Sequence, residues 1–383
     1  MKRSVKFGID ILLLQASSYQ NKRIALVCNK ASVTQTGLHS RIALQNAGFN
    51  LVRLFAPEHG FDTQGVDGAY IDHEIDPLTQ LPIISLYSDK LSPHAKDLED
   101  IDLIVIDLPD IGSRFYTYLW TMSYILESAA LFSKSVLLLD RPNPQAHSLS
   151  LAEGPILQED CASFIGRYPI PVTHQCTFGE LAQYFKANYY PNLSLKVIPM
   201  QNWDRSTNDG YYFHPTSPAI QQRDTVYTYP GTCLFEGLNI HEGRETAYPF
   251  SQFGAPWIDA DALYHVASAR LHDAILQVVH FVSTTDVYPD QRCHGLRIIP
   301  KDPKSFQSFS YFIEMIQLIN SLFPGKLTER NYLTNVNPSG TKHLDKLIGL
   351  PNAFELLQNN QIDTKKGIQE WQEDIKPFLI YNT

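Results

Sequence analysis

The sequence predicts an α/β protein, in which a Rossmann-like doubly wound parallel sheet domain is followed by a smaller α+β domain. Short aliphatic runs alternate with helix-like segments through the first half of the chain, and this pattern stops where a stretch rich in Gly, Pro, Asn, Thr and Tyr begins. The chain has 383 residues, more than one ordinary hydrophobic core contains. We therefore expect a first domain over residues 1–225 and a second domain over residues 226–383.

The strands of the first domain are predicted from runs that carry apolar residues at consecutive positions. These runs occupy residues 23–28, 50–55, 82–87, 103–107, 135–140 and 195–199. Strands that are apolar on both faces are typical of a parallel sheet covered by helices on both sides. Helices are expected over residues 118–132 and 178–189, where apolar and aromatic side chains recur at helical spacing.

The second domain has a less regular pattern. Residues 203–257 show little periodicity, which predicts long loops that join the two domains. Helices are then expected over residues 260–276, 309–323 and 368–375, and strands over residues 278–283 and 295–299. This mixture predicts a small α+β domain.

Composition and charge exclude several classes of protein. The formal net charge is −9 and the chain has no block rich in Lys and Arg, so nucleic acid is not an expected partner. Near the N-terminus, the only uninterrupted aliphatic run is residues 11–14, which is too short for a signal peptide or a membrane span. We expect a cytoplasmic protein, or a periplasmic or secreted one if a leader has been removed. The five cysteines form no CxxC pair, which argues against a zinc site or a disulfide framework.

Polar residues directly follow four of the predicted strands, at the end where each strand stops. They are Asn29, Lys30, Glu58, His59, Asp110, Arg114, Tyr116, Tyr118, Asp140, Arg141 and Asn143. Ligands of doubly wound sheets bind outside the carboxyl ends of the strands, so we expect these residues to converge on one site. No GxGxxG or GxxxxGK[ST] motif follows a strand, so the sequence does not predict a dinucleotide or P-loop nucleotide site.

Five sequence blocks, in the same order, resemble the NamZ-type exo-β-N-acetylmuramidases, a family long known only as a domain of unknown function. The blocks are APEHG at 56–60, DLPDIGSRFYTY at 107–118, DRPNP at 140–144, YPGTCLFEGLN with EGR at 229–244, and FGAPWID at 253–259. The resemblance runs from about residue 5 to the C-terminus. It implies a cleft between the two domains and release of N-acetylmuramic acid from the non-reducing ends of peptidoglycan fragments. It implies no metal, nucleotide or other cofactor.

The chain departs from the usual pattern of this family in four places. An acid that usually follows EHG is absent from Asp67-Gly68-Ala69, a usual Gln is Pro109, a usual His-Gly is His174-Gln175, and a usual Gly is Glu245. The first difference leaves a second hypothesis open, that the chain is a catalytically impaired paralogue that binds muropeptides or other sugars.

Glycoside hydrolysis usually requires two carboxyl groups, one on each side of the scissile bond. Glu58 is our candidate for the acid or base, and His59 would tune it or bind a substrate hydroxyl. Asp110 or Asp107 is the first choice for the second carboxylate. Glu236 and Glu242, in the region that joins the domains, are the next candidates. The sequence does not give the separation of the carboxylates, so retaining and inverting mechanisms both stay open.

The resemblance also implies a set of substrate-binding residues. They are Arg114, Tyr116, Tyr118, Arg141, Asn143, His174, Glu236, Asn239 and Arg244. The arginines would hold the lactyl carboxylate of muramic acid, the tyrosines would contact the sugar ring, and the asparagines would bind its hydroxyl or acetamido groups. A purely structural role stays open for Arg114 and Tyr118, and for His174 it is the favoured interpretation.

Overall fold

The first domain is built on a seven-stranded sheet. The computed structural model describes residues 4–19, 21–62, 65, 69–70, 74–285 and 287–382. The strands are β1 (Ile24–Val27), β2 (Leu51–Ala56), β3 (Glu74–Ile75), β4 (Pro82–Ser85), β5 (Leu103–Ile106), β6 (Ser135–Leu139) and β7 (Leu195–Ile198). Their order is β3-β4-β2-β1-β5-β6-β7, and all pairs are parallel except β3 with β4. The predicted doubly wound parallel sheet is therefore confirmed, and the chain changes direction along the sheet between β1 and β5.

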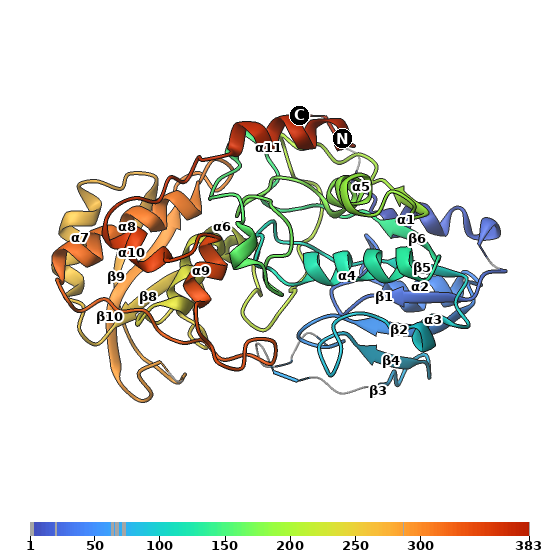
Figure 1. The fold of residues 1–383 in the computed structure, drawn as a ribbon, viewed down its shortest axis with the longest axis horizontal. Helices are drawn as coiled ribbons and strands as arrows, with labels where there is room; N and C mark the ends of the chain where they lie inside the picture. The colour runs from blue at the N-terminus through green and yellow to red at the C-terminus, as the bar shows by residue number, and fades with distance from the viewer. Residues whose placement is uncertain are drawn as a thin grey trace.

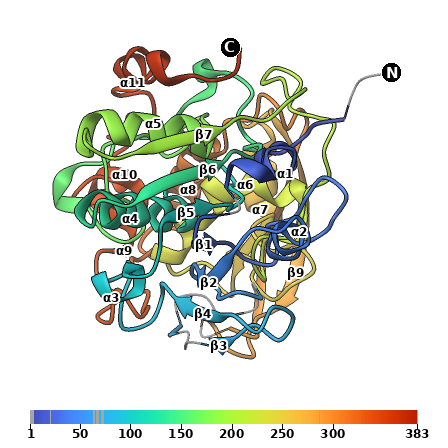
Figure 2. The same ribbon diagram turned by 90° about the vertical axis from the view of Figure 1, so that its right-hand side faces the viewer.

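Helices cover both faces of this sheet (Figure 2). They are α1 (Gly8–Leu13), α2 (Ser40–Asn46), α3 (Ala95–Leu98), α4 (Tyr118–Leu131) and α5 (Phe178–Tyr189). Side chains of a strand alternate between the faces. Ala25 and Val27 accordingly pack in the core that contains α4 and α5, whereas Ile24 and Leu26 pack in the core that contains α1. Because both faces are covered, every residue of β1 is buried, which explains its continuous apolar run.

The second domain contains a three-stranded antiparallel sheet with the order β8-β10-β9. Its elements are α6 (Arg223–Thr232), β8 (Gln252–Ala255), α7 (Ala260–Ser268), β9 (Ala274–Val282), β10 (Arg292–Pro300), α8 (Ser308–Leu322), α9 (His343–Ile348) and α10 (Ala353–Gln358). Figure 1 shows this domain at the left and the seven-stranded sheet at the right. Short 3-10 turns occur at Ala16–Ser18, Leu149–Leu151, Glu159–Cys161, Cys233–Gly237 and Lys376–Phe378. Among the described residues, no helix is long and apolar enough to cross a membrane.

Two predictions for the second half of the chain are wrong. Residues 203–257 are not only loops, because α6 and β8 lie within them. Gly231 is a packing residue of α6 rather than a loop signal, since a Cβ there would overlap the ring of Phe312 on α8. The helix predicted over residues 260–276 ends at Ser268, and β9 begins at Ala274. There, buried Leu276 and exposed Ile275 follow the two-residue period of a strand.

Arg114 joins the two domains. It is fully buried, and its guanidinium donates hydrogen bonds to the carbonyls of Pro155 (2.7 Å) and Ile170 (2.9 Å) in the first domain. It also donates to the carbonyls of Leu347 and Ile348 in α9, both at 2.9 Å. The C-terminal end of a helix carries unpaired carbonyls and partial negative charge, so a buried cation is stabilised there.

The last helix, α11 (Ile368–Ile375), crosses back to the first domain, where it packs against α5 (Figure 1). Trp371 of α11 donates from its indole nitrogen to the carbonyl of His174 at 3.2 Å. Tyr381 then donates to the Asp140 carboxylate at 2.7 Å, just past the end of β6. The polypeptide therefore connects the two domains in both directions.

We expect Arg114→Met to lower the free energy of unfolding by on the order of 4 kcal/mol or more. The substitution leaves four buried carbonyls without a donor, and each unsatisfied buried group costs about 1–3 kcal/mol. Chemical denaturation measures the change, with Arg270→Met at an exposed position as the control. Unchanged stability combined with weaker sugar binding would instead support a role for Arg114 as a substrate ligand.

Candidate active site

A cavity lies between the two domains and receives side chains from both. Its empty volume, which includes space open to solvent, is about 780 Å³. The polar residues that line it are Glu58, His59, Thr117, Ser163, Ser217, Glu236, Arg244, Thr334, Asn337, His343 and Lys346. The aromatic residues are Tyr87, Phe115, Tyr116, Phe164, Tyr229, Phe250 and Tyr332. Apolar rings with polar groups between them suit a sugar, whose faces are apolar and whose edges carry hydroxyls.

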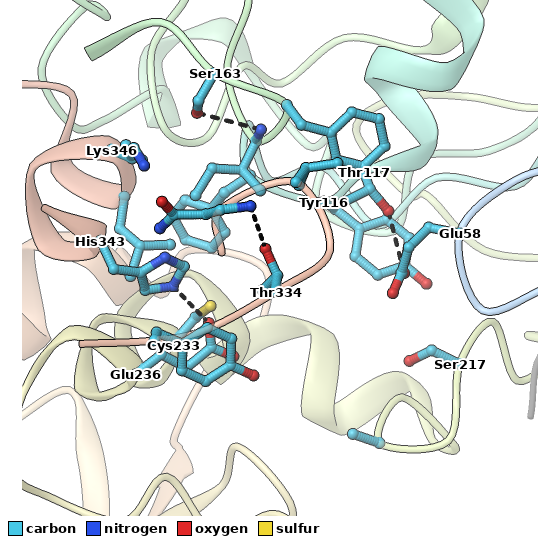
Figure 3. A pocket seen from close by; sticks show the side chains of 18 of the residues that line it. Glu58, Tyr116, Thr117, Ser163, Ser217, Cys233, Glu236, Thr334, His343 and Lys346 are labelled. Carbon is cyan, nitrogen blue, oxygen red and sulfur yellow. Dashed lines mark hydrogen bonds and ion pairs between the residues drawn. The ribbon is translucent and has the colours of Figure 1, made fainter. Parts of the chain in front are cut away.

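Glu58 lies in the tight turn that follows β2, and its side chain is only 3% exposed. The turn is closed by a hydrogen bond from the Gly60 amide to the Pro57 carbonyl (3.1 Å), and His59 has a positive φ of 64°. This left-handed conformation is uncommon outside glycine and is often found at functional sites. The turn directs the Glu58 carboxyl into the cavity, where Thr117 donates to it at 3.4 Å (Figure 3).

Glu58 and His59 share a proton. His59 Nε2 lies 2.8 Å from Glu58 Oε2, and His59 Nδ1 lies 3.0 Å from the carbonyl of Gly65. A carbonyl only accepts hydrogen bonds, so Nδ1 carries a hydrogen and donates it. The contact between Nε2 and Oε2 then requires one more proton, on either the imidazole or the carboxyl. A buried pair that holds one mobile proton is suited to general acid–base chemistry.

Glu236 faces the cavity from the second domain, in the 3-10 turn that follows α6. Arg244 donates to its Oε1, and His343 Nε2 lies 3.1 Å from its Oε2. Arg244 also lies 3.0 Å from Glu242, so that one guanidinium joins two buried carboxylates. Burial raises the pKa of Glu242. In Figure 3, Glu58 with Thr117 and Glu236 with His343 lie on opposite sides of the cavity.

Five of the predicted site residues line this cavity, and seven do not. The five are Glu58, His59, Tyr116, Glu236 and Arg244. The seven are Asp110, Arg114, Tyr118, Arg141, Asn143, His174 and Asn239. Tyr116 presents its ring to the cavity and donates from its hydroxyl to Thr216 Oγ1 at 2.7 Å. The predicted convergence of the loops on one site therefore holds for the loop after β2 and for part of the loop after β5.

The crevice at the switch between β1 and β5 is occupied by an ion pair of the chain itself. Arg141 binds Asp107 bidentately, from Nε at 2.6 Å and from Nη2 at 2.8 Å. Ser40 also donates to this carboxylate, and Arg141 donates to the carbonyl of Val33 at 2.7 Å. Asp107 is fully buried. Both residues thus hold strand ends together at the position where doubly wound folds usually bind ligands.

Asp110 lies opposite His174, and both are buried. Burial raises the pKa of Asp110 to about 7 and lowers the pKa of His174 to about 3. The Cys176 amide donates to His174 Nδ1 at 3.2 Å, so the neutral ring carries its hydrogen on Nε2, which faces Asp110 Oδ2 at 3.6 Å. Asp110 and Arg141 border a separate, smaller cavity, away from Glu58.

Three other predicted site residues hold backbone in place. Asn143 donates to the carbonyl of Cys176 at 2.9 Å, and Tyr118 donates to the carbonyl of Thr216 at 2.6 Å. Asn239 donates to the carbonyl of Lys326 at 2.9 Å. Their hydrogen-bonding groups face the chain rather than the cavity.

The second domain contributes a wall of the cavity that was not predicted from the sequence. Tyr332, Thr334, Asn337, His343 and Lys346 all line the cavity. They come from a Gly-, Asn- and Pro-containing segment without periodicity and from the short helix that follows it. The polar composition of that segment was the only available signal. Ala69 does not line the cavity, and Asp67 lies outside the described residues.

The described part of the chain contains no group of three or more His, Cys, Asp or Glu side chains placed to hold a metal ion. The carboxylates that face the cavity are instead engaged by arginine and histidine. This arrangement can transfer protons and stabilise charge.

We expect Asp110→Asn to stabilise the protein more at pH 8 than at pH 4. The folded-state pKa of Asp110, about 7, lies above its ordinary value of 3.8, so wild-type stability falls as pH rises between these values. Asparagine does not titrate, and each unit of pKa shift corresponds to about 1.4 kcal/mol. Denaturation of both proteins across this pH range measures the difference. A stability difference independent of pH would show that Asp110 is ionised when folded.

Comparison with known proteins identifies the family. The family models for the N-terminal and C-terminal parts of the exo-β-N-acetylmuramidase NamZ match residues 24–224 and 227–381. The chain is 33% identical to the peptidoglycan β-N-acetylmuramidase NamZ of Bacillus subtilis strain 168, over 99% of this chain and 92% of the relative. Crystal structures of two DUF1343 family proteins from Bacteroides fragilis NCTC 9343 superpose with TM-scores of 0.85 and 0.77, at 25% identity and 99% coverage of both chains. The chain therefore belongs to the NamZ family of exo-β-N-acetylmuramidases, the family that its five sequence blocks resemble.

Proposed function

We propose that this protein is a glycoside hydrolase that releases N-acetylmuramic acid from the non-reducing ends of peptidoglycan fragments. The observation that carries the proposal is the buried Glu58–His59 pair, which faces Glu236 across a cavity between the domains. The similarity to a peptidoglycan β-N-acetylmuramidase supports the same substrate class.

Glu58 is the proton donor in this proposal. The proton that it shares with His59 passes to the glycosidic oxygen as the bond to the anomeric carbon breaks. The transition state has oxocarbenium character, and a carboxylate on the opposite side stabilises its positive charge. Glu236 fills this role, because Arg244 and His343 hold its carboxyl group in place on the far side of the cavity. The anomeric configuration of the released sugar distinguishes attack by Glu236 from attack by water that it activates.

Lys346 is the candidate for recognition of the lactyl carboxylate. It lines the cavity, and none of the ion pairs found between described residues includes it. Among the described residues, its Nζ donates one long hydrogen bond, to the carbonyl of Thr341 at 3.4 Å. Partial burial lowers the pKa of Lys346, and a bound carboxylate would offset that cost of burial. Arg244 is already engaged by two carboxylates, which makes it a weaker candidate.

Glu58→Gln is expected to reduce hydrolysis of a chromogenic N-acetylmuramide by about 10²–10⁴-fold, the usual contribution of a general acid. The melting temperature should stay close to that of the wild type, because glutamine keeps the size and the hydrogen-bonding oxygen of the side chain. The control is Glu314→Gln, at an exposed position of α8. Sugar binding by the wild type without any turnover would favour the impaired-paralogue hypothesis, and turnover by the wild type would exclude it.

Lys346→Met is expected to remove the preference for substrates that carry a lactyl group. A lost hydrogen bond to a charged partner costs about 1.5–3 kcal/mol, roughly 10–100-fold in affinity. Competition of N-acetylmuramic acid and N-acetylglucosamine for the cavity measures this preference, since the two sugars differ in the lactyl carboxylate. The same preference in the variant as in the wild type would place the carboxylate elsewhere.

A further inference from the structure

A wider groove lies next to the cavity. Its empty volume is about 1980 Å³, more than twice that of the cavity. The two spaces share His59, Ala219, Arg244 and Tyr332 as lining residues, so they are adjacent. An enzyme that removes one terminal sugar must place the rest of the glycan outside the cavity that holds this unit. The groove is the larger space of the two, and His59, the neighbour of the candidate acid, lines it.

Arg297 is the cation of this groove that lacks a described carboxylate partner. Arg244 and Arg330 also line the groove, but both lie against Glu242, at 3.0 and 3.8 Å. None of the ion pairs among the described residues includes Arg297. Its guanidinium carbon lies 3.5 Å from the centroid of the Tyr248 ring, and its buried Nε has no hydrogen-bond partner in the part of the chain that the structure describes. The stacking orients the guanidinium without neutralising its charge.

The position of Arg297 is defined by the second sheet. It lies in β10, where it is paired with Gln252 on β8 and with Gln277 on β9. Its neighbours Leu296 and Ile298 are buried in the core, so Arg297 points to the opposite face of the sheet. A side chain on a central strand holds its position more precisely than one on a loop, which suits a binding role.

We propose that Arg297, stacked on Tyr248, binds a carboxylate of the glycan beyond the bond that is cleaved. This inference rests on the proposed function. N-acetylmuramic acid alternates with N-acetylglucosamine in peptidoglycan, so the third sugar from the end carries the next lactyl carboxylate. A guanidinium binds a carboxylate through two parallel hydrogen bonds, which fixes the register of the chain. Arg297 thereby favours longer fragments over a single muramide.

The test compares a peptide-free tetrasaccharide, which begins with N-acetylmuramic acid, with a chromogenic N-acetylmuramide. The ratio of kcat/KM for the two substrates should fall about 10–100-fold in Arg297→Gln, the effect of one lost charge-assisted pair. Arg297→Lys should recover part of the ratio. Arg292→Gln, at an exposed position of the same strand, is the control and should leave the ratio unchanged. An unchanged ratio in Arg297→Gln would overturn the inference.

Two further substrates identify the source of the carboxylate. If Arg297 binds the lactyl group, a tetrasaccharide with a methyl ester on the lactyl carboxylate of the third sugar should give a lower kcat/KM ratio in the wild type. The kcat/KM ratio of Arg297→Gln should not change with this substrate. If a stem peptide supplies the carboxylate, only peptide-bearing fragments should distinguish the two proteins. That outcome would overturn the assignment to the lactyl group.

The proposed function and this inference fail in different ways. No hydrolysis of either substrate by the wild type would contradict the proposed function. Calorimetry of tetrasaccharide binding would still test Arg297. Equal affinity in the wild type and Arg297→Gln would then contradict the inference.

Discussion

The buried Arg114 guanidinium joins the two domains by hydrogen bonds to backbone carbonyls of both. Its side chain leaves the loop before α4, reaches between Pro155 and Ile170, and ends on the last carbonyls of α9. Helix α9 stops at Gly349, whose φ of 88° ends the helix, and a Cβ there would lie 2.6 Å from Arg114. A glycine at this position thus allows the cation to approach the helix end. The attraction is between a full charge and aligned backbone dipoles.

This constraint positions the candidate active site. His343 and Lys346 belong to α9, so the helix that Arg114 holds also forms one wall of the cavity. The opposite wall is the turn after β2, in which Glu58 is buried beside His59. The two candidate carboxylates, Glu58 and Glu236, come from different domains. Their separation is therefore set by how the domains pack, and a change at Arg114 would reach the chemistry without contact with the substrate.

The location of the cavity departs from the usual rule for doubly wound sheets. The crevice between β1 and β5 is closed by the pair of Asp107 and Arg141, and the cavity lies further along the same edge, next to the second domain. The loop after β5 serves both places. Asp107 and Asp110 stay at the sheet, whereas Tyr116 and Thr117 reach the cavity. A single polar loop can thus supply both structural and active-site residues. Because these residues are close together in the sequence, their positions alone do not show which of them have which role.

The pattern of residues was sufficient for the parallel sheet, its six parallel strands and the placement of Glu58 directly after one of them, because these follow from local periodicity and from turn chemistry next to a strand. It was also sufficient for the family, since five blocks in order are a linear signal. The roles of the arginines could not be predicted from their neighbours in the sequence. Arg114, Arg141 and Arg244 have the same chemistry, but one binds carbonyls of the other domain, one neutralises a buried Asp, and one lines the cavity. Which partner each guanidinium meets depends on contacts between distant segments, and those exist only once the two domains have packed together.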